Sequence, residues 1–290
     1  MKLDIFSHCV IDTIYLNNSK HVTSGGPSCY CSLTSRALKF DVTLHTKFGS
    51  DFPLVDYLNE QKIKLEDAMS TKPTTQFTLE ISGSERTLSL QNQCEPLNNV
   101  SLDADSVLIS PVFDEISNDV FMKIKRDANF VFLDPQGFLR RKGIDNKIHL
   151  ASTDLNLSKI SAIKTSPDEL NALTGISTID GMNVLQKKGI EYVILTDKQN
   201  ISLLFNGKIY SLKLPNIELY DTTGIGDIFS TTFCCTIIKE KDFLWALCFA
   251  AGSAQAALEN KEIGLDKIPS RGAIETNATY FYNTVKFREI

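Results

Sequence analysis

The chain has 290 residues, 42% of them hydrophobic, and a formal net charge of −5. A chain of this length can bury roughly 75% of its unfolded surface, which is enough for one large α/β domain. It has no basic run, which argues against nucleic acid as a partner, and its longest apolar stretches are too short or too interrupted to span a membrane. Because the N-terminus lacks a signal-peptide pattern, we expect a cytoplasmic protein.

The cysteines and histidines carry no recognisable metal pattern. The seven cysteines include no C-x-x-C pair, and the four histidines are scattered along the chain. Zinc sites have characteristic close spacings of these residues, whereas cysteines in a cytosolic chain are usually buried and reduced. We therefore expect structural thiols and no metal cluster or catalytic triad.

Strand and helix patterns alternate in the first half of the chain. Strands are predicted at 3–7, 11–16 and 42–46, and helices at 28–38 and 53–59. From 74 to 90, polar and apolar residues alternate on both sides of the turn Ser82-Gly83-Ser84. This pattern predicts a β-hairpin with one polar face. A hairpin within an otherwise alternating chain indicates a small inserted sheet.

The second half is more regular. Strands are predicted at 106–109, 130–133, 161–164 and 192–196, and helices at 116–128, 167–173, 179–188, 226–238 and 243–258. A second hairpin is predicted at 201–212, with Asn206-Gly207 at its turn. Strand–helix alternation of this kind predicts an α/β fold with a mostly parallel sheet and helices on both faces. We find no repeat or linker, and so expect one domain.

The segment 221–230, DTTGIGDIFS, is the part of the sequence that predicts a catalytic site. It follows an extended piece at 216–220 and opens a helix. Gly224 and Gly226 permit a tight turn that aims backbone N–H groups at one point, and the helix start adds further N–H groups and a positive dipole end. Such a site suits a transferring phosphoryl group. Asp227 beside it can accept the proton of an attacking hydroxyl.

A shorter version of this pattern is also typical of an ordinary helix after a glycine turn, where Asp, Thr and Gly are favoured. Neither standard nucleotide-loop pattern applies, since Phe229 replaces the third glycine of G-x-G-x-x-G and no G-K-[ST] follows. The full ten-residue string closely resembles the D-T-x-G-x-G-D signature of the ribokinase-like (PfkB) carbohydrate kinase family.

The resemblance implies a three-layer αβα sandwich with a small inserted β-sheet lid. It implies a single kinase domain over 1–290, with lid segments at about 10–24 and 72–92. Within the signature, it implies that Asp227 is the catalytic base and that the backbone of Gly224, Ile225 and Gly226 forms an anion hole. Asp221 would brace this loop, often near a monovalent cation.

Other segments resemble the family's binding residues. Asp12 resembles an aspartate that holds substrate hydroxyls, and Gly25-Gly26 resembles a glycine pair at the substrate hinge, with Tyr30 following. Glu169, in Ser166-Pro167-Asp168-Glu169, resembles the glutamate of an N-x-x-E motif that organises magnesium and phosphate through water. The resemblance further implies nucleotide-binding roles for Thr196, Thr222 and Lys164.

Three positions depart from the family pattern: Ser166 replaces the asparagine of N-x-x-E, Tyr30 stands where sugar-specific members carry asparagine, and Lys198 stands where a glycine is usual. Gly25-Gly26-Pro27 with Tyr30, and 134–137 followed by Arg140, resemble the branch that includes inositol kinases. The resemblance thus implies ATP- and magnesium-dependent transfer to a hydroxyl of a sugar or cyclitol, by a monomer or homodimer. A nucleoside kinase and a non-catalytic binding protein remain alternatives.

Overall fold

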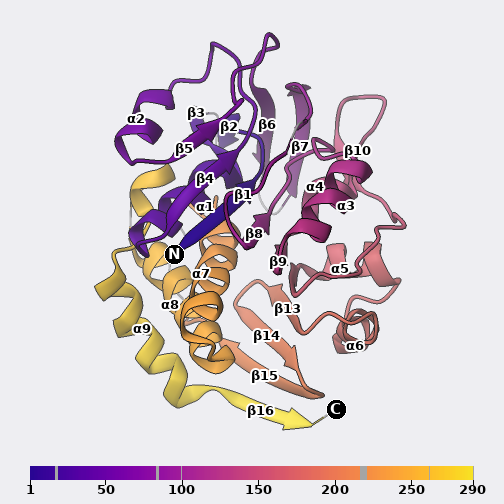
Figure 1. The fold of residues 1–290 in the computed structure, drawn as a ribbon, viewed down its shortest axis with the longest axis vertical. Coiled ribbons are helices and arrows are strands. Elements are labelled where there is room, and N and C mark those ends of the chain that lie inside the picture. Colours follow the sequence, from indigo (N-terminus) through magenta and orange to yellow (C-terminus); the bar gives the residue numbers. More distant parts are fainter. Residues whose placement is uncertain (17–18, 83–84, 99, 216–220, 261, 290) are drawn as a thin grey trace.

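A central sheet organises the computed structural model, which describes residues 1–16, 19–82, 85–98, 100–215, 221–260 and 262–289, and ten strands form this sheet within those ranges. Its parallel part runs in the order β5 (Lys64–Glu66), β4 (Asp41–His45), β1 (Lys2–Phe6), β8 (Ser106–Ile109), β9 (Phe130–Leu133), β12 (Ala162–Thr165) and β13 (Tyr192–Asp197). The antiparallel strands β14 (Asn200–Phe205), β15 (Lys208–Lys213) and β16 (Lys286–Glu289) continue the sheet (Figure 1).

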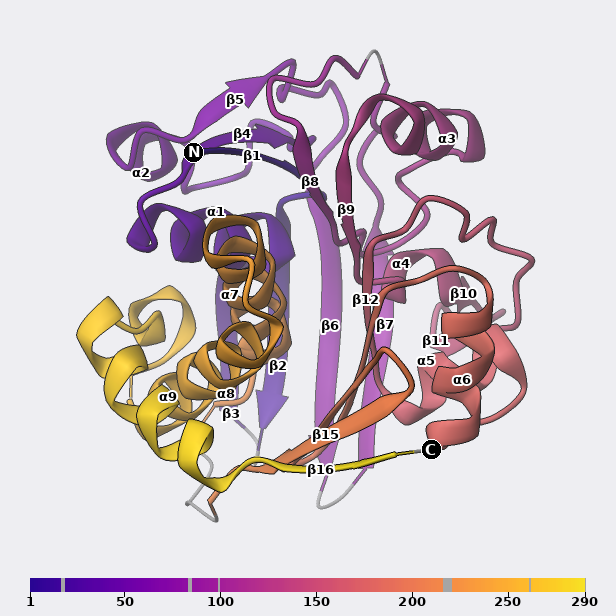
Figure 2. The ribbon, with the colours of Figure 1, turned by 60° about the horizontal axis from the view of Figure 1, so that its bottom comes forward.

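Helices cover both faces of this sheet (Figure 2). One layer contains α1 (Gly26–Ala37), α7 (Ile225–Glu240), α8 (Phe243–Glu259) and α9 (Arg271–Thr284), and the other contains α3 (Asn118–Asp127), α5 (Pro167–Thr174) and α6 (Ile179–Lys187). The described residues also form three short helical pieces: α2 (Val55–Glu60), α4 (Gln136–Leu139) and the 3-10 helix η1 (Gly264–Lys267). The predicted α/β fold with a mostly parallel sheet and helices on both faces is confirmed.

Each helical layer has its own apolar core. In β8, Leu108 belongs to the cluster under α7 and α8, while its neighbours Val107 and Ile109 belong to the cluster under α3. Successive strand side chains point to opposite faces, so a strand covered on both sides is apolar throughout. This is why short apolar runs predicted the central strands. No helix in the described part of the chain is long and apolar enough to cross a membrane.

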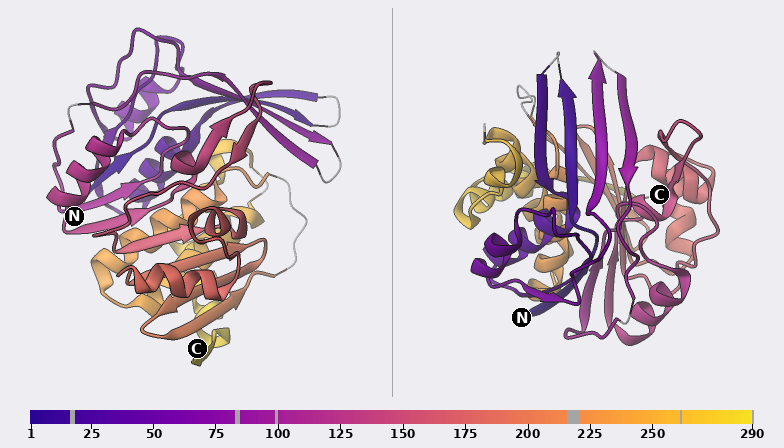
Figure 3. Two further views of the ribbon diagram at one scale, coloured as in Figure 1. Left: turned by 90° about the vertical axis from the view of Figure 1, so that its right-hand side faces the viewer. Right: turned by 90° about the horizontal axis from the view of Figure 1, so that it is seen from above.

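A separate small sheet stands off the body of the protein (Figure 3). Its order is β3 (Ser19–Gly25), β2 (Val10–Leu16), β6 (Thr75–Ser82) and β7 (Glu85–Asn92), with β2 and β6 parallel. The predicted hairpin at 74–90 is therefore confirmed, although its turn residues 83–84 lie outside the described residues. A two-stranded ribbon, β10 (Arg140–Lys142) with β11 (Ile148–Leu150), lies next to β7.

The small sheet starts at the carboxyl edge of the central sheet. Only residues 7–9 separate the end of β1 from the start of β2. Because parallel strands point the same way, the ends of β1, β8, β9 and β12 meet at this edge, where ligands bind in folds of this class. The fold thus places the small sheet over the edge at which a site is expected.

Candidate active site

The signature segment folds as a tight turn followed by a helix. Gly224 caps α7 with a left-handed backbone (φ 77°), and the Thr223 N–H donates to Asp221 Oδ1 at 2.9 Å. A Cβ atom on Gly224 would lie 2.5 Å from the ring of Tyr30, so both the backbone angle and the space require glycine here. The predicted turn and helix are confirmed, whereas the predicted extended piece at 216–220 lies outside the described residues.

Asp227 lies on the first turn of α7 and lines a cavity of about 170 Å³. The sequence-predicted residues that share this cavity come from three separate segments and are Asp12, Gly26, Tyr30, Thr222, Gly224 and Asp227. Thr222, for which the resemblance implied a nucleotide contact, also lines this cavity. The cavity thus brings together Asp227, the predicted base, the loop 221–226 (called the anion loop below, after its predicted role) and the predicted acceptor residues Asp12 and Tyr30.

The two glycines before α1 have different surroundings. Gly26 has a left-handed backbone (φ 73°), and a Cβ atom there would lie 2.7 Å from Val10 Cγ2. Gly25 is buried as the residue before the helix, and the Ser28 hydroxyl donates to its carbonyl at 3.1 Å. Close approach of α1 to β2 therefore depends on Gly26, which places Tyr30 against the anion loop.

The small sheet forms one wall of the cavity, with Phe77 from β6 and Asp12 from β2. Arg140 completes this side: its guanidinium donates to the Val112 carbonyl at 2.9 Å and lies 5.8 Å from the centre of the Phe77 ring. The sequence indicates Arg140 only through the resemblance to the branch that includes inositol kinases, and not as a site residue. Its place in the cavity arises from the packing of the β10–β11 ribbon against β7.

A buried ion pair lies beside the anion loop. Lys164 Nζ is 2.6 Å from Asp134 Oδ2, and the same ammonium would be 3.4 Å from a Cβ atom on Gly226. Burial alone would lower the pKa of Lys164, but Asp134 and Glu169 raise it well above its ordinary value. The lysine therefore keeps its positive charge next to the backbone of Gly226.

The electrostatics at Asp227 suit a base. Burial is the largest cause that raises its pKa, and the Asp134 carboxylate raises it further. Lys164 and Arg140 act in the opposite direction, and the pKa of Asp227 reaches about 7. A carboxylate with a pKa near neutrality can both take and release a proton at physiological pH.

Glu169 lies in a capping box at the start of α5. Its Oε2 accepts the Ser166 N–H at 2.7 Å, and the Ser166 hydroxyl accepts the Glu169 N–H at 3.3 Å. Burial raises the pKa of Glu169. Among the described residues, no group of three or more His, Cys, Asp or Glu residues could hold a metal by itself. A single carboxylate fits magnesium, which keeps several waters and takes its other ligands from substrate phosphates.

Two further positions lie near the end of β13. The Thr196 hydroxyl is half-buried and 3.5 Å from the Thr165 carbonyl, at the carboxyl edge of the sheet. Lys198 is exposed in the β13–β14 turn and has a left-handed backbone (φ 52°). Because that conformation favours glycine, the family's usual residue at this position follows from the turn geometry.

Lys267 is a site residue that the sequence did not reveal. Its ammonium contacts Asp221, next to which the resemblance implied a monovalent cation. The lysine comes from η1, 46 residues away along the chain. No local motif marks it, since its place depends on how η1 packs against the loop.

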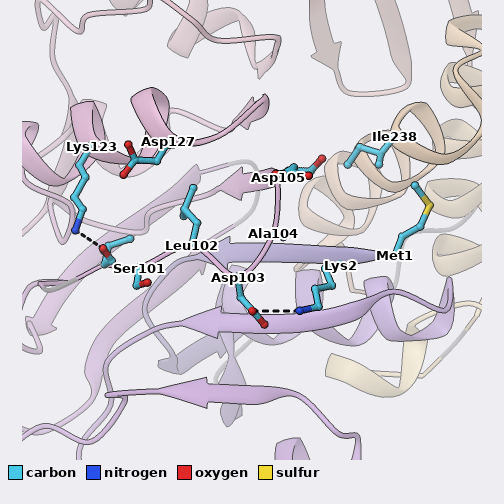
Figure 4. Close-up of a pocket in the computed structure, with 12 residues that line it drawn as sticks. Met1, Lys2, Ser101, Leu102, Asp103, Ala104, Asp105, Lys123, Asp127 and Ile238 are labelled. Atoms are coloured by element: carbon cyan, nitrogen blue, oxygen red, sulfur yellow. Dashed lines mark hydrogen bonds and ion pairs between the residues drawn. The ribbon is translucent and has the colours of Figure 1, made fainter.

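A larger cavity, of about 700 Å³, lies at the opposite edge of the sheet (Figure 4). It is lined by the start of β1, the segment before β8 and the end of α3. Several of its charged groups pair with the protein itself, for example Lys2 with Asp103 at 3.2 Å. These are the amino ends of the parallel strands, away from the edge where ligands of such folds bind.

Comparison with known proteins finds a sequence relative and solved structures of similar fold. A ribokinase from Haemophilus influenzae is 32% identical to the chain over 127 residues, which is 41% of each protein. A pyrophosphate-dependent kinase in the ribokinase family, solved with a pyrophosphate analogue and myo-inositol, superposes with a TM-score of 0.82 at 18% identity, covering 94% of this chain and 99% of that one. Arabidopsis thaliana ribokinase, solved with ribose and ATP, superposes with a TM-score of 0.73 at 17% identity, covering 96% and 98%.

The structural likenesses show a shared fold, and the family match goes further. Residues 12–271 match the family described as pfkB family carbohydrate kinase. This range includes nearly all of the small sheet, the capping box of α5 and the whole anion loop with Asp227. The chain therefore belongs to the pfkB family of carbohydrate kinases.

Proposed function

We propose that this kinase transfers the γ-phosphoryl group of ATP to a hydroxyl of a sugar or cyclitol, with Asp227 as the base. The observation that carries the proposal is the position of Asp227. It lies at the junction of a glycine loop that can bind an anion and a small cavity that can bind a polyol. Asp227 lines that cavity, which favours a catalytic protein over a kinase-like binding protein.

The donor phosphates would bind on the helix side of the junction. The N–H groups of Gly224, Ile225 and Gly226 would hold the transferring group, since the first N–H groups of a helix have no partner within it. Lys164 supplies a fixed positive charge beside Gly226, and Thr196 lies farther along the same edge. Magnesium would supply charge neutralisation on the phosphates, and Glu169 would hold it through water.

The acceptor would bind on the small-sheet side. Asp12 would accept hydrogen bonds from substrate hydroxyls, while the Gly25-Gly26 turn and Tyr30 shape the wall. Asp227 would take the proton of the attacking hydroxyl as the phosphoryl group is transferred to the hydroxyl oxygen. The small sheet, formed by the segments 10–24 and 72–92, would act as a lid over the acceptor. Its closure would exclude water and limit hydrolysis of the donor.

The size of the cavity favours a small acceptor. Its volume of about 170 Å³ is below the range of about 300–1,000 Å³ that is usual for pockets that hold drug-sized ligands, which suits one ring with its hydroxyls. A nucleoside would also need an aromatic face for its base, but Arg140 already lies over the ring of Phe77. We therefore favour a sugar or cyclitol over a nucleoside, and the structural similarity to a kinase solved with myo-inositol supports this choice.

A donor and acceptor panel tests the proposal. Purified protein is given magnesium with either ATP or pyrophosphate, and sugars, cyclitols or nucleosides as acceptors, with Asp227→Asn measured in parallel. We expect ATP consumption that depends on a sugar or cyclitol and disappears in the variant. Transfer only from pyrophosphate would correct the donor, and transfer only to nucleosides would refute the proposed acceptor class.

The pKa of Asp227 predicts the pH dependence of the reaction. The base must be ionised to take a proton, so kcat/KM should rise with pH and level off above an apparent pKa of about 7. The measurement is kcat/KM for the acceptor across that range at saturating donor. Asp227→Asn should lack this limb. A wild-type profile that stays flat through neutrality would remove Asp227 from the role of base.

A further inference from the structure

A buried ammonium group lies under the anion loop. Lys267 has no exposed surface, and its Nζ donates to the carbonyls of Asp221 and Thr223 at 3.0 and 2.9 Å and to Asp221 Oδ2 at 2.5 Å. Asp221 Oδ2 also accepts the Gly264 N–H at 3.2 Å. Three oxygens of the loop, two of them from the main chain, thus converge on one positive charge.

The contact with Thr223 reaches the anion hole through a single peptide unit. The Thr223 carbonyl and the Gly224 N–H belong to the same planar, trans peptide, in which the C=O and N–H point in opposite directions. Holding the carbonyl on a cation therefore fixes the N–H on the other side, toward the anion. The positive charge also polarises the peptide so that its N–H becomes a stronger donor.

The three oxygens around Lys267 Nζ are of the kinds that coordinate metal cations in proteins. Main-chain carbonyls can replace the hydration shell of potassium, and carboxylate and carbonyl oxygens suit hard cations in general. Here the lysine side chain already satisfies them. Hydrogen bonds from Lys267 and Thr223 outweigh burial and keep the pKa of Asp221 below its ordinary value, as expected for an ion pair. A second cation does not fit where the ammonium stands.

We propose that Lys267 is a built-in replacement for a monovalent cation: it is a positioning residue that holds the anion loop, so that phosphoryl transfer needs no potassium. The resemblance had implied an ion beside Asp221, and the structure has a side chain there instead. The effect on transfer rests on the kinase function proposed above, whereas the occupancy of the oxygens by lysine can be tested without it.

The test compares potassium, ammonium and choline chlorides at equal ionic strength. Choline is the control cation, because it is too large to bind among the three oxygens. Melting temperature and kcat are measured for the wild type and for Lys267→Ala, which opens space for an ion. The wild type should give the same values in all three salts. In choline, the variant should melt earlier and lose roughly 10- to 100-fold in kcat, the usual effect of removing the outer support of a site. Potassium or ammonium should restore both.

Two matched variants separate ion replacement from general damage. Lys267→Met removes the charge but fills the space, so its losses should persist in every salt. Lys125→Ala removes another buried lysine, whose ammonium contacts the Asn156 carbonyl and side chain far from the loop. That variant should melt earlier without any response to potassium. Rescue that was equal for Lys267→Ala and Lys125→Ala would contradict a specific ion site.

Several outcomes would overturn the inference. A wild type that gains kcat or melting temperature in potassium would show that the lysine does not replace the ion. A Lys267→Ala protein whose kcat and melting temperature do not change with potassium or ammonium would also contradict the inference. If that variant does not fold, the kcat and melting temperature of the wild type in the three salts still show whether the protein needs potassium. If no acceptor supports transfer, the proposed function fails, while the melting temperatures still test the cation site.

Discussion

Asp227→Asn is expected to lower turnover by ~10²- to 10⁴-fold, the usual contribution of a general base, while the fold remains intact. The amide keeps the size of the side chain and its place on the first turn of α7, but it cannot take the acceptor's proton. The measurement is steady-state kcat at saturating donor and acceptor. Because the change affects the proton acceptor and not the anion loop, the KM for the donor should change little.

The stability of the same variant provides an independent control. An unfolded aspartate ionises near a pKa of about 3.9, whereas burial raises the pKa of folded Asp227 to about 7. The folded wild type therefore binds the proton more tightly and loses stability as the pH rises through that window. The variant should melt at the same temperature as the wild type below the window and at a higher temperature above it. An earlier melting at high pH would indicate a structural role for the carboxylate.

Gly224→Ala is expected to lower kcat by ~10²- to 10³-fold, the range for removing one oxyanion-hole donor. The alanine would be strained at φ 77°, and its Cβ would lie 2.5 Å from the Tyr30 ring. Either the loop or the tyrosine must move, which changes the direction of the Gly224 N–H and the wall of the acceptor cavity. The measurement is kcat together with the KM values for donor and acceptor.

Gly207→Ala is the matched control for this substitution. Gly207 has a similar left-handed backbone (φ 71°) in the β14–β15 turn, but a Cβ atom there would meet nothing within 4 Å. It should carry a similar backbone strain, and so lose some melting temperature, with kcat unchanged. A Gly224→Ala enzyme that keeps the activity of Gly207→Ala would contradict the assignment of the anion loop.

The sequence predicted the core strands because their signals are local. β8 and β9 have the bounds expected from apolar runs at 106–109 and 130–133. The β14–β15 hairpin was marked by Asn206-Gly207, both of which adopt the left-handed backbone that such a turn requires (φ 47° and 71°). In these places the residues that set the structure are neighbours along the chain.

Elements that depend on distant partners have no strand pattern of their own, although the resemblance implied a lid segment at about 10–24. β3 is mostly polar, and it becomes a strand by pairing along its whole length with β2. β16 is exposed throughout and is ordered as an edge strand by β15. Neither has a period or a run that would distinguish it from a loop. Their structure follows from tertiary pairing, which overrides weak local preference.

The same distinction applies to the candidate site. Asp227 and Gly224 could be predicted because the whole anion loop is one continuous motif. Arg140 and Lys267 reach it from β10 and η1, far along the chain, and single basic residues at such positions are usually surface charges. The link between Tyr30 and Gly224 is also long-range, and it explains why a bulky ring can stand where other members carry asparagine: the ring packs on the loop.

The most direct test of the proposed chemistry is to detect the phosphomonoester itself. Wild type and Asp227→Asn are incubated with donor, magnesium and a panel of sugars and cyclitols, and the product is followed by phosphorus NMR. We expect a new phosphomonoester signal with the wild type and at least one acceptor, and none with the variant on the same time scale. Equal product from both proteins, or donor breakdown without any ester from the wild type, would contradict transfer to a polyol with Asp227 as the base.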